Sequence, residues 1–138
     1  MEIQTEQILK TLMLLNKRMY DNRDAISFQN ILEENKNEIT FLKEQFQLNE
    51  VETLLFVLSC IRTIGYGDLY TNLDKIASHC NLSIFEILLH QKAIQSLIDK
   101  GFWEIEENQY YKEDKSSLMD IQRKDIYLNH SVHKYFMM

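Results

Sequence analysis

The sequence predicts a mainly helical domain with a small β-hairpin near its C-terminal end. The 138 residues include no proline and only three glycines, so few positions interrupt a helix. Over most of the chain, apolar residues recur at the spacing that one buried face of a helix requires. Two short segments, 102–106 and 126–128, have the residue types and alternation of strands instead.

Residues 1–48 are expected to form a helical extension that packs on a second unit, residues 49–138. From Glu2 to Tyr20 the apolar side chains fall on one helical face. A second amphipathic run covers about Ala25 to Phe46, and its pattern leaves open an interruption near residues 35–37.

The helix that follows is predicted to lie at the centre of the core. Asn49 is placed to cap it, and the run VETLLFVLSCIRTI is apolar nearly all round, which is typical of a helix covered on every side. Gly65 and Gly67 end this helix. Thr71 or Asn72 then caps a short helix whose inward residues are Leu73, Ile76, Ala77 and Cys80.

Ser83 is predicted to cap a longer helix that runs to Lys100. Gly101 ends it, because glycine adopts the left-handed backbone conformation without steric cost. The alternating segment 102–106 then begins a hairpin whose second strand lies around residues 126–128 and whose tip is the polar segment 107–124.

This order of elements resembles a winged helix-turn-helix with two additional N-terminal helices. The residues that carry the resemblance occupy the helix crossing, the turn, the capping position and the entry to the hairpin: Leu73, Ile76, Ala77, Leu82, Ser83, Ile87, Ile94, Leu97, Gly101 and Phe102. One departure concerns length. Ser83 and Gly101 are nearly one helical turn further apart than in the usual pattern.

A longer part of the chain, from Leu48 to Phe136, resembles the N-terminal region of certain bacterial AAA-type ATPases. The run LNEVETLLFVLSCI precedes the helix-turn-helix, and DIYLNHSVHKYF follows the hairpin. The resemblance implies a module that docks a partner protein or a downstream ATPase domain. The chain itself contains no GxxxxGK[ST] phosphate-binding loop, so we expect no enzymatic activity from it.

The expected partner surface lies at the start of the helix that Ser83 caps. Ile84, Phe85, Leu88 and Leu89 cannot all face inward together with Ile87, so part of this apolar surface should be exposed or covered by a partner. Changing Ile84 and Leu88 to polar residues is therefore expected to weaken self-association or partner binding without unfolding the domain. A homodimer stays open as an alternative.

The competing hypothesis is a DNA-binding regulator. A recognition helix presents basic and amide side chains near its N-terminus, whereas this one has no basic residue before Lys92, and the chain carries a net charge of -6. Contact with protein is therefore the preferred hypothesis. If DNA is bound, the candidate contacts are Ser83, His90, Gln91, Lys92, Tyr110, Tyr111, Lys112, Arg123 and Lys124.

The remaining patterns do not indicate a cofactor, a metal site or a catalytic site. His130 and His133 lack a third ligand of suitable spacing, and His79 and Cys80 are helical neighbours that point in different directions. Cys60 and Cys80 lie in apolar helical patterns, so buried reduced thiols are expected. Since no apolar run reaches the roughly 18 residues of a membrane span, we expect a cytoplasmic protein.

Overall fold

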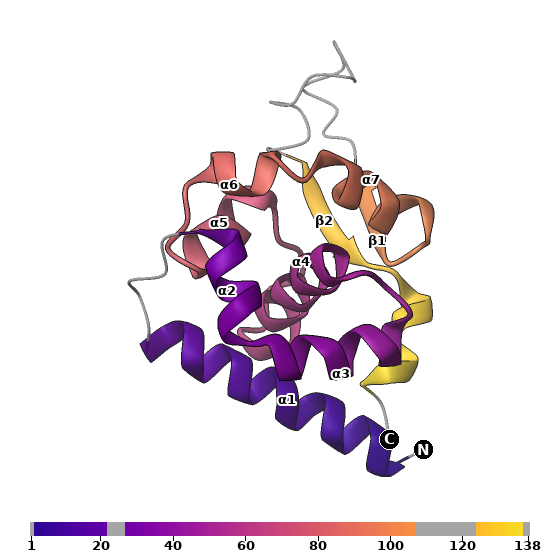
Figure 1. Ribbon diagram of the computed structural model, residues 1–138. Helices are drawn as coiled ribbons and strands as arrows, with labels where there is room; N and C mark the ends of the chain where they lie inside the picture. Colours follow the sequence, from indigo (N-terminus) through magenta and orange to yellow (C-terminus); the bar gives the residue numbers. More distant parts are fainter. Residues whose placement is uncertain (1, 22–26, 107–123, 137–138) are drawn as a thin grey trace.

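The computed structural model describes residues 2–21, 27–106 and 124–136 and confirms a mainly helical chain with a small antiparallel sheet (Figure 1). The helices are α1 (Glu2–Asp21), α2 (Phe28–Glu34), α3 (Lys36–Phe46), α4 (Glu50–Cys60), the π-helical turn η1 (Ile61–Gly65), α5 (Leu73–His79), α6 (Ile84–Leu88), α7 (Gln91–Asp99) and the 3-10 helix η2 (His130–Tyr135). The strands are β1 (Trp103–Glu106) and β2 (Asp125–Leu128). No helix within the described ranges is long and apolar enough to cross a membrane.

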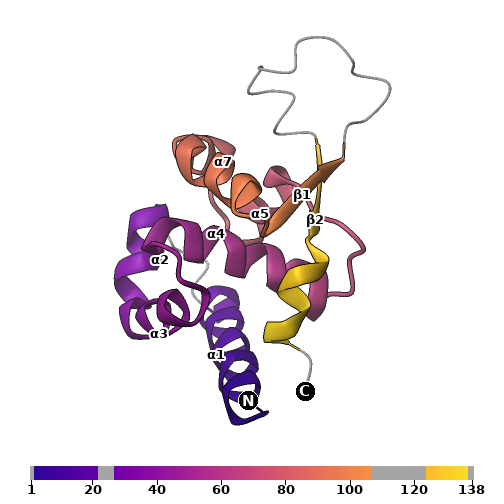
Figure 2. The ribbon, with the colours of Figure 1, turned by 90° about the vertical axis from the view of Figure 1, so that its right-hand side faces the viewer.

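The N-terminal helices cover one side of α4 (Figure 2). Helix α1 buries Ile8, Leu12, Leu15 and Met19 of its predicted apolar face, whereas Leu9 is half-buried. The second run is interrupted at Asn35, a possibility that its pattern left open, and this residue separates α2 from α3. The Asn35 side chain is buried and donates to the Ile31 carbonyl at 2.9 Å, a local bond that competes with regular helix.

Helix α4 is the centre of the core, as its all-round apolar pattern predicted. Residues 52–60 are all buried, and α3, α5 and α7 each pack against the helix. Its N-terminus forms a capping box: Asn49 Oδ1 accepts from the Glu52 backbone N–H at 2.8 Å, and Glu52 Oε1 accepts from the Asn49 backbone N–H at 2.9 Å. At the other end the chain continues into η1 and leaves the helical conformation after Gly65.

Glu52 is a buried carboxylate, only 1% exposed, that also binds residues of α7 and its C-terminal cap. The Ser96 hydroxyl donates to Oε2, and Lys100 Nζ lies 3.1 Å from each carboxylate oxygen. Burial by itself raises the pKa of Glu52. The hydrogen bonds from Asn49, Ser96 and Lys100, together with the Lys100 charge, outweigh burial and leave the pKa below its usual value.

The predicted single helix from Ser83 to Lys100 is wrong. The structure divides it into α6 and α7, with Leu89 and His90 between them. The His90 N–H bonds to the Ile87 carbonyl at 3.0 Å, which tightens the last turn of α6. The His90 ring packs on Phe28 of α2 with ring centroids 4.4 Å apart. Helix α6 then packs on α5, whereas α7 packs on α4 and β1.

The caps and the helix end that the sequence indicated are present. Asn72 caps α5 by accepting from the Lys75 backbone N–H at 2.9 Å, and Ser83 caps α6 by accepting from the Phe85 N–H at 3.2 Å. Gly101 follows α7 with a φ of 82°, which is the left-handed conformation expected there.

The hairpin is confirmed as an antiparallel pair in which Trp103 lies opposite Leu128 and Ile105 opposite Ile126. Thr71 adds an isolated bridge on the other side of Ile126. Trp103 is 1% exposed, and its Nε1–H donates to Ser59 Oγ of α4 at 2.9 Å. The hairpin is therefore tied to the central helix by both apolar packing and a buried hydrogen bond.

Replacing Glu52 by glutamine is expected to lower the free energy of unfolding near neutral pH by about 2 kcal/mol, because the Lys100 ion pair is lost and the buried hydrogen bonds are weakened. The folded state lowers the pKa of Glu52 below its usual value of 4.5. Its ionisation therefore stabilises the fold above that value, and this contribution is lost as the pH falls through the lower pKa of the folded state.

Urea denaturation of wild type and Glu52→Gln tests this dependence. The difference in unfolding free energy should shrink between about pH 6 and about pH 3. Glu50→Gln changes an exposed carboxylate in the same helical turn and should cost less than about 0.5 kcal/mol. A difference that is constant with pH would contradict the role of the Glu52 charge.

Candidate functional site

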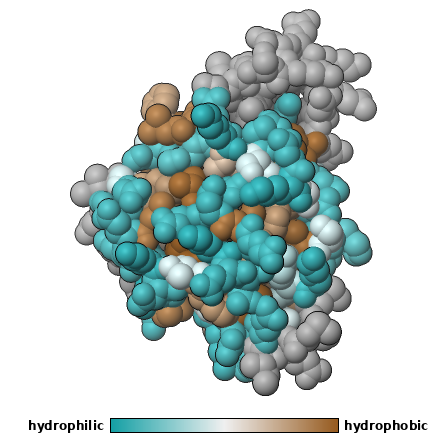
Figure 3. Space-filling model, turned by 45° about the vertical axis from the view of Figure 1, so that its right-hand side comes forward, coloured by the Kyte–Doolittle hydropathy of each residue, from teal (hydrophilic) through white to brown (hydrophobic). Residues whose placement is uncertain are grey.

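The predicted partner surface is only partly exposed. Phe85 and Leu89 are 73% and 77% exposed, whereas Ile84 and Leu88 are half-buried and pack against the core. Ile87 is fully buried and fixes α6 on the body of the protein. We call Phe85 and Leu89 the α6 ridge. Figure 3 shows apolar side chains standing out from a mostly hydrophilic surface at the upper left, on the side of the molecule where α6 lies.

The ridge projects because of how α6 begins and ends. Asn81 adopts a φ of 56°, and the buried Leu82 fills the turn before the Ser83 cap. Phe85 and Leu89 are four positions apart, so they lie one above the other on the outer face. The chain then turns away at His90, which leaves both side chains without cover from α7.

The candidate nucleic-acid contacts fall into three groups. Ser83 is exposed, but its hydroxyl caps α6, and His90 packs on Phe28. Gln91 and Lys92 are exposed at the start of α7, and Lys124 is half-buried just before β2. Tyr110, Tyr111, Lys112 and Arg123 lie outside the described residues.

Burial lowers the pKa of His90, and the Glu86 carboxylate opposes this effect. His90 is therefore less readily protonated than an ordinary histidine and is a poor partner for a phosphate group. Of the described candidates, Gln91 and Lys92 offer the most accessible polar side chains.

The neighbouring pair His79 and Cys80 does not form a nucleophile and a base. Cys80 is buried, and burial raises its pKa to about 12, so the thiol keeps its proton near neutral pH. Burial and the Arg62 charge both lower the pKa of His79. His79 Nε2 lies 3.0 Å from Asn16 Oδ1, which gives the imidazole a structural role between α1 and α5. Cys60 is likewise buried and free, as predicted.

No group of three potential metal ligands comes together among the described residues. The His130 and His133 rings contact each other edge to face, with centroids 4.9 Å apart, and both lie on η2. The pair supplies two imidazoles, and no carboxylate or thiolate of the described part of the chain completes a ligand set around them.

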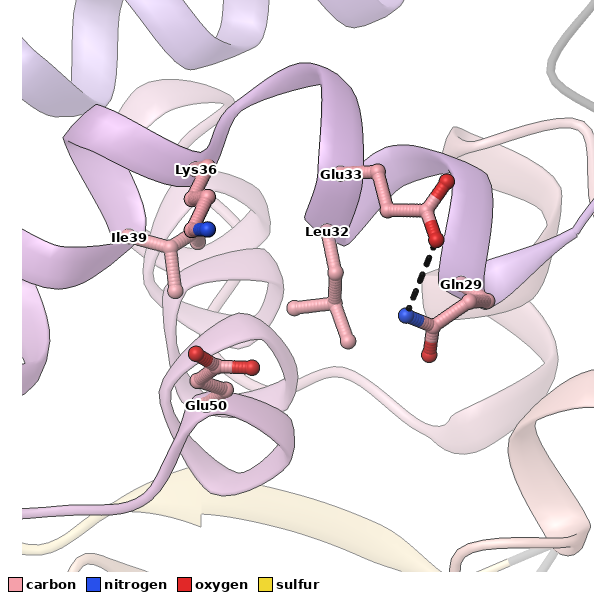
Figure 4. Close-up of a pocket in the computed structure, with 6 residues that line it drawn as sticks. All are labelled: Gln29, Leu32, Glu33, Lys36, Ile39 and Glu50. Carbon is pink, nitrogen blue, oxygen red and sulfur yellow. Dashed lines mark hydrogen bonds between the residues drawn. The ribbon is translucent and has the colours of Figure 1, made fainter.

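A shallow depression of about 250 Å³ lies between α2, α3 and the start of α4 (Figure 4). Its apolar residues are Leu32 and Ile39, and its polar residues are Gln29, Glu33, Lys36 and Glu50. Gln29 donates to Glu33 at 3.4 Å. The two carboxylates belong to exposed side chains. This is a mixed surface without the arrangement of a catalytic site.

Sequence reasoning missed a second, more apolar groove of about 270 Å³. It is lined by Thr63, Ile64 and Leu69 from the segment that begins in η1, by Tyr127 and Leu128 of β2, and by His133 and Phe136. The only signal in the sequence is the cluster of large apolar residues around GYGDLY. That cluster does not indicate which part of the chain it faces, because β2 and η2 are distant in sequence.

Comparisons of the chain with protein-family models, with curated proteins and with solved structures found no match. Any functional assignment therefore depends on the residues and the geometry of the chain itself.

Replacing Phe85 and Leu89 together by serine is expected to change the free energy of unfolding by less than about 1 kcal/mol, because both side chains are exposed. Ile87→Ser, on the opposite face of α6, should cost about 3 kcal/mol or more by leaving a cavity and a buried hydroxyl. Urea denaturation measures both. Equal losses would place the α6 ridge in the core.

The half-buried positions Ile84 and Leu88 are poorer sites for testing partner binding. Both pack against the core, so polar residues there would also reduce stability. Phe85 and Leu89 are therefore the better positions at which to test partner binding by substitution.

Proposed function

We propose that this chain is a non-catalytic interaction module of the winged helix-turn-helix type that contacts another protein through the α6 ridge. The observation that carries the proposal is the exposure of Phe85 and Leu89 at the start of the second helix of the motif. A DNA-reading helix presents basic and amide side chains at that position. Large exposed apolar side chains are instead typical of the centre of a protein interface.

The arrangement of the elements supports the winged-helix part of the proposal. Helix α5 packs on α6 across the short turn at Leu82, and α7 leads through Gly101 into the β1–β2 hairpin. The isolated bridge between Thr71 and Ile126 adds a short third extended segment at the β2 edge. The unusual separation of Ser83 and Gly101 is accommodated by the break between α6 and α7 rather than by a longer recognition helix.

The proposed partner follows from the resemblance of residues 48–136 to the N-terminal region of bacterial AAA-type ATPases. Under this proposal the α6 ridge contacts either an ATPase domain or a separate protein. A second copy of the chain is the third candidate partner of the α6 ridge. The ridge is small, so we expect it to form the centre of an interface whose rim is polar, such as Glu86 and Gln91 beside it.

The alternative function, a DNA-binding regulator, is favoured by one feature of the structure. Gln91 and Lys92 are exposed at the start of α7, where side chains could reach a groove of a duplex. The electrostatics oppose it. The chain has a net charge of -6, and the helix between Ser83 and Leu89 carries Glu86 as its only charged residue.

A photo-crosslinking amino acid at position 89 should capture a protein in cells that naturally produce this chain. The physical reason is that an exposed leucine at an interface centre comes within reach of the partner. Position 40, where Thr40 is exposed on α3, is the control and should give no such adduct. Absence of a protein adduct at position 89, or equal adducts at both positions, would overturn the proposal.

Fluorescence anisotropy with labelled duplex DNA tests the alternative function, a DNA-binding regulator. At about 150 mM salt we expect no binding tighter than the roughly 1–100 μM of weak non-specific association. Lys92→Ala should then leave the signal unchanged. Sub-micromolar binding with a steep salt dependence, reduced by Lys92→Ala, would favour the DNA-binding regulator.

A further inference from the structure

The described part of the chain carries two exposed apolar surfaces of opposite shape. Its three most exposed large apolar side chains are Leu69 at 84%, Leu89 at 77% and Phe85 at 73%. Phe85 and Leu89 form the α6 ridge, whereas Leu69 belongs to the groove beside β2. Exposed apolar surface of this kind is typical of a protein contact. A ridge and a groove of similar chemistry can supply the two sides of one contact.

The ridge and the groove lie too far apart for one chain to bring them together. Helix α6 is at the upper left of Figure 1, whereas helix η2, which contributes His133 to the groove, is the yellow helix at the lower right. In Figure 2 the segment that follows η1, strand β2 and helix η2 lie together at the right of the molecule. A contact between the ridge and such a groove therefore joins two copies of the chain.

The groove has the size of a site for one or two side chains of another protein. Its volume is about 270 Å³, just below the roughly 300–1,000 Å³ typical of small-molecule sites. Ile64 and Leu69 contribute from the segment that begins in η1, and Leu128 and Phe136 contribute from the C-terminal part of the chain. A large apolar side chain that enters the groove is therefore contacted by two separate parts of the protein.

The small area of the α6 ridge favours a concave counterpart over a second ridge. Phe85 and Leu89, at 73% and 77% exposure, present roughly 300 Å² between them, whereas a stable interface takes about 800 Å² from each partner. Two ridges packed on each other would bury only this small area. Insertion into the groove also buries Leu69 and Ile64, so the same ridge removes more apolar surface from water.

The charges at the two surfaces allow this contact. No lysine, arginine or carboxylate is among the described residues that line the groove, and His133 is their only basic side chain. Glu86 is the only charged residue between Ser83 and Leu89, so it meets no like charge in the lining. The opposing term is long-range, because each copy carries a net charge of -6 and repels the next.

We propose that the chain associates head to tail, with the α6 ridge of one copy seated in the groove beside β2 of the next. This proposal rests on the proposed function of the ridge and assigns a second copy as its partner. Because the two surfaces differ, a pair still has one free ridge and one free groove. Association therefore continues beyond the pair, into a ring or an open filament.

Sedimentation velocity of the full wild-type chain up to about 1 mM measures the association. We expect a dissociation constant of about 10–1,000 μM, because the contact is smaller than a standard interface. The sedimentation coefficient should continue to rise past that of a dimer. Raising the salt from about 0.05 to about 0.5 M should strengthen the association, because salt screens the repulsion between acidic copies.

Two variants that each lack one surface test the head-to-tail arrangement. Phe85→Ser, Leu89→Ser removes the ridge, and Ile64→Ser, Leu69→Ser removes the exposed apolar side chains of one side of the groove. Each variant should stay monomeric by itself. An equimolar mixture restores one ridge and one groove, so it should form a dimer and nothing larger. Met13→Ser, at a side chain 71% exposed on α1 and outside both surfaces, is the matched control and should associate as wild type does.

A photo-crosslinking amino acid at position 89 of the purified chain locates the contact. In the dimeric product, mass spectrometry should place the crosslink on the segments that carry Leu69, Leu128 or Phe136. Far-ultraviolet circular dichroism of each variant establishes that the fold is retained.

Any of three results overturns the proposal: a wild-type chain that is monomeric at about 1 mM, a mixture of the two variants that forms no dimer, or a groove variant that associates as wild type does. A monomeric chain whose position 89 still captures another protein in cells removes this proposal and leaves the proposed function standing. Absence of any adduct at position 89 in cells removes the proposed function itself.

Discussion

The structure depends on the need to cover helix α4 on every side. Residues 52–60 are all buried, so no face of this helix is left for water. Elements from both ends of the chain are required to surround it, including α3 from the N-terminal part and α7 and β2 from the C-terminal part. Two polar side chains of α4 inside this shell have specific partners: Glu52 bonds to Ser96 and Lys100, and Ser59 to Trp103. These bonds select one docking of α7 and the hairpin among many arrangements with similar apolar burial.

The covering of α4 also determines which apolar side chains are left exposed on the surface. Because Glu52 and the apolar contacts hold α7 against α4, α6 packs on α5 instead and leaves Phe85 and Leu89 exposed. The chain between α4 and α5 has to leave the core through η1, and this exit places Leu69 beside β2. Both candidate binding surfaces thus lie where the chain enters or leaves elements that cover the central helix. They differ in shape, since one is an exposed apolar ridge and the other is an apolar groove.

The buried thiol of Cys80 and the imidazole of His79 have structural roles in the protein. Cys80 is buried with a pKa of about 12, and His79 bonds to Asn16 between α1 and α5. The depression lined by Leu32 and Ile39 has exposed charged residues at its rim. The proposed role as a binding module therefore agrees with both the interior and the surface of the described chain.

The sequence alone determined the local features of this protein, because caps, helix ends and apolar periodicity depend on neighbouring residues. The Asn49 and Ser83 caps, the Gly101 helix end and the two strands were predicted from such signals, and an interruption near Asn35 was left open. Only the tertiary structure decided where the predicted helix from Ser83 to Lys100 breaks. No glycine or proline marks that point, and the break coincides with His90 packing against Phe28 from a distant part of the chain. The tertiary structure also decided that Phe85 and Leu89 are exposed while Ile84 and Leu88 pack inward. It likewise placed Leu69 beside β2 in a groove. The sequence does not determine these features because each depends on contacts between segments far apart in the chain.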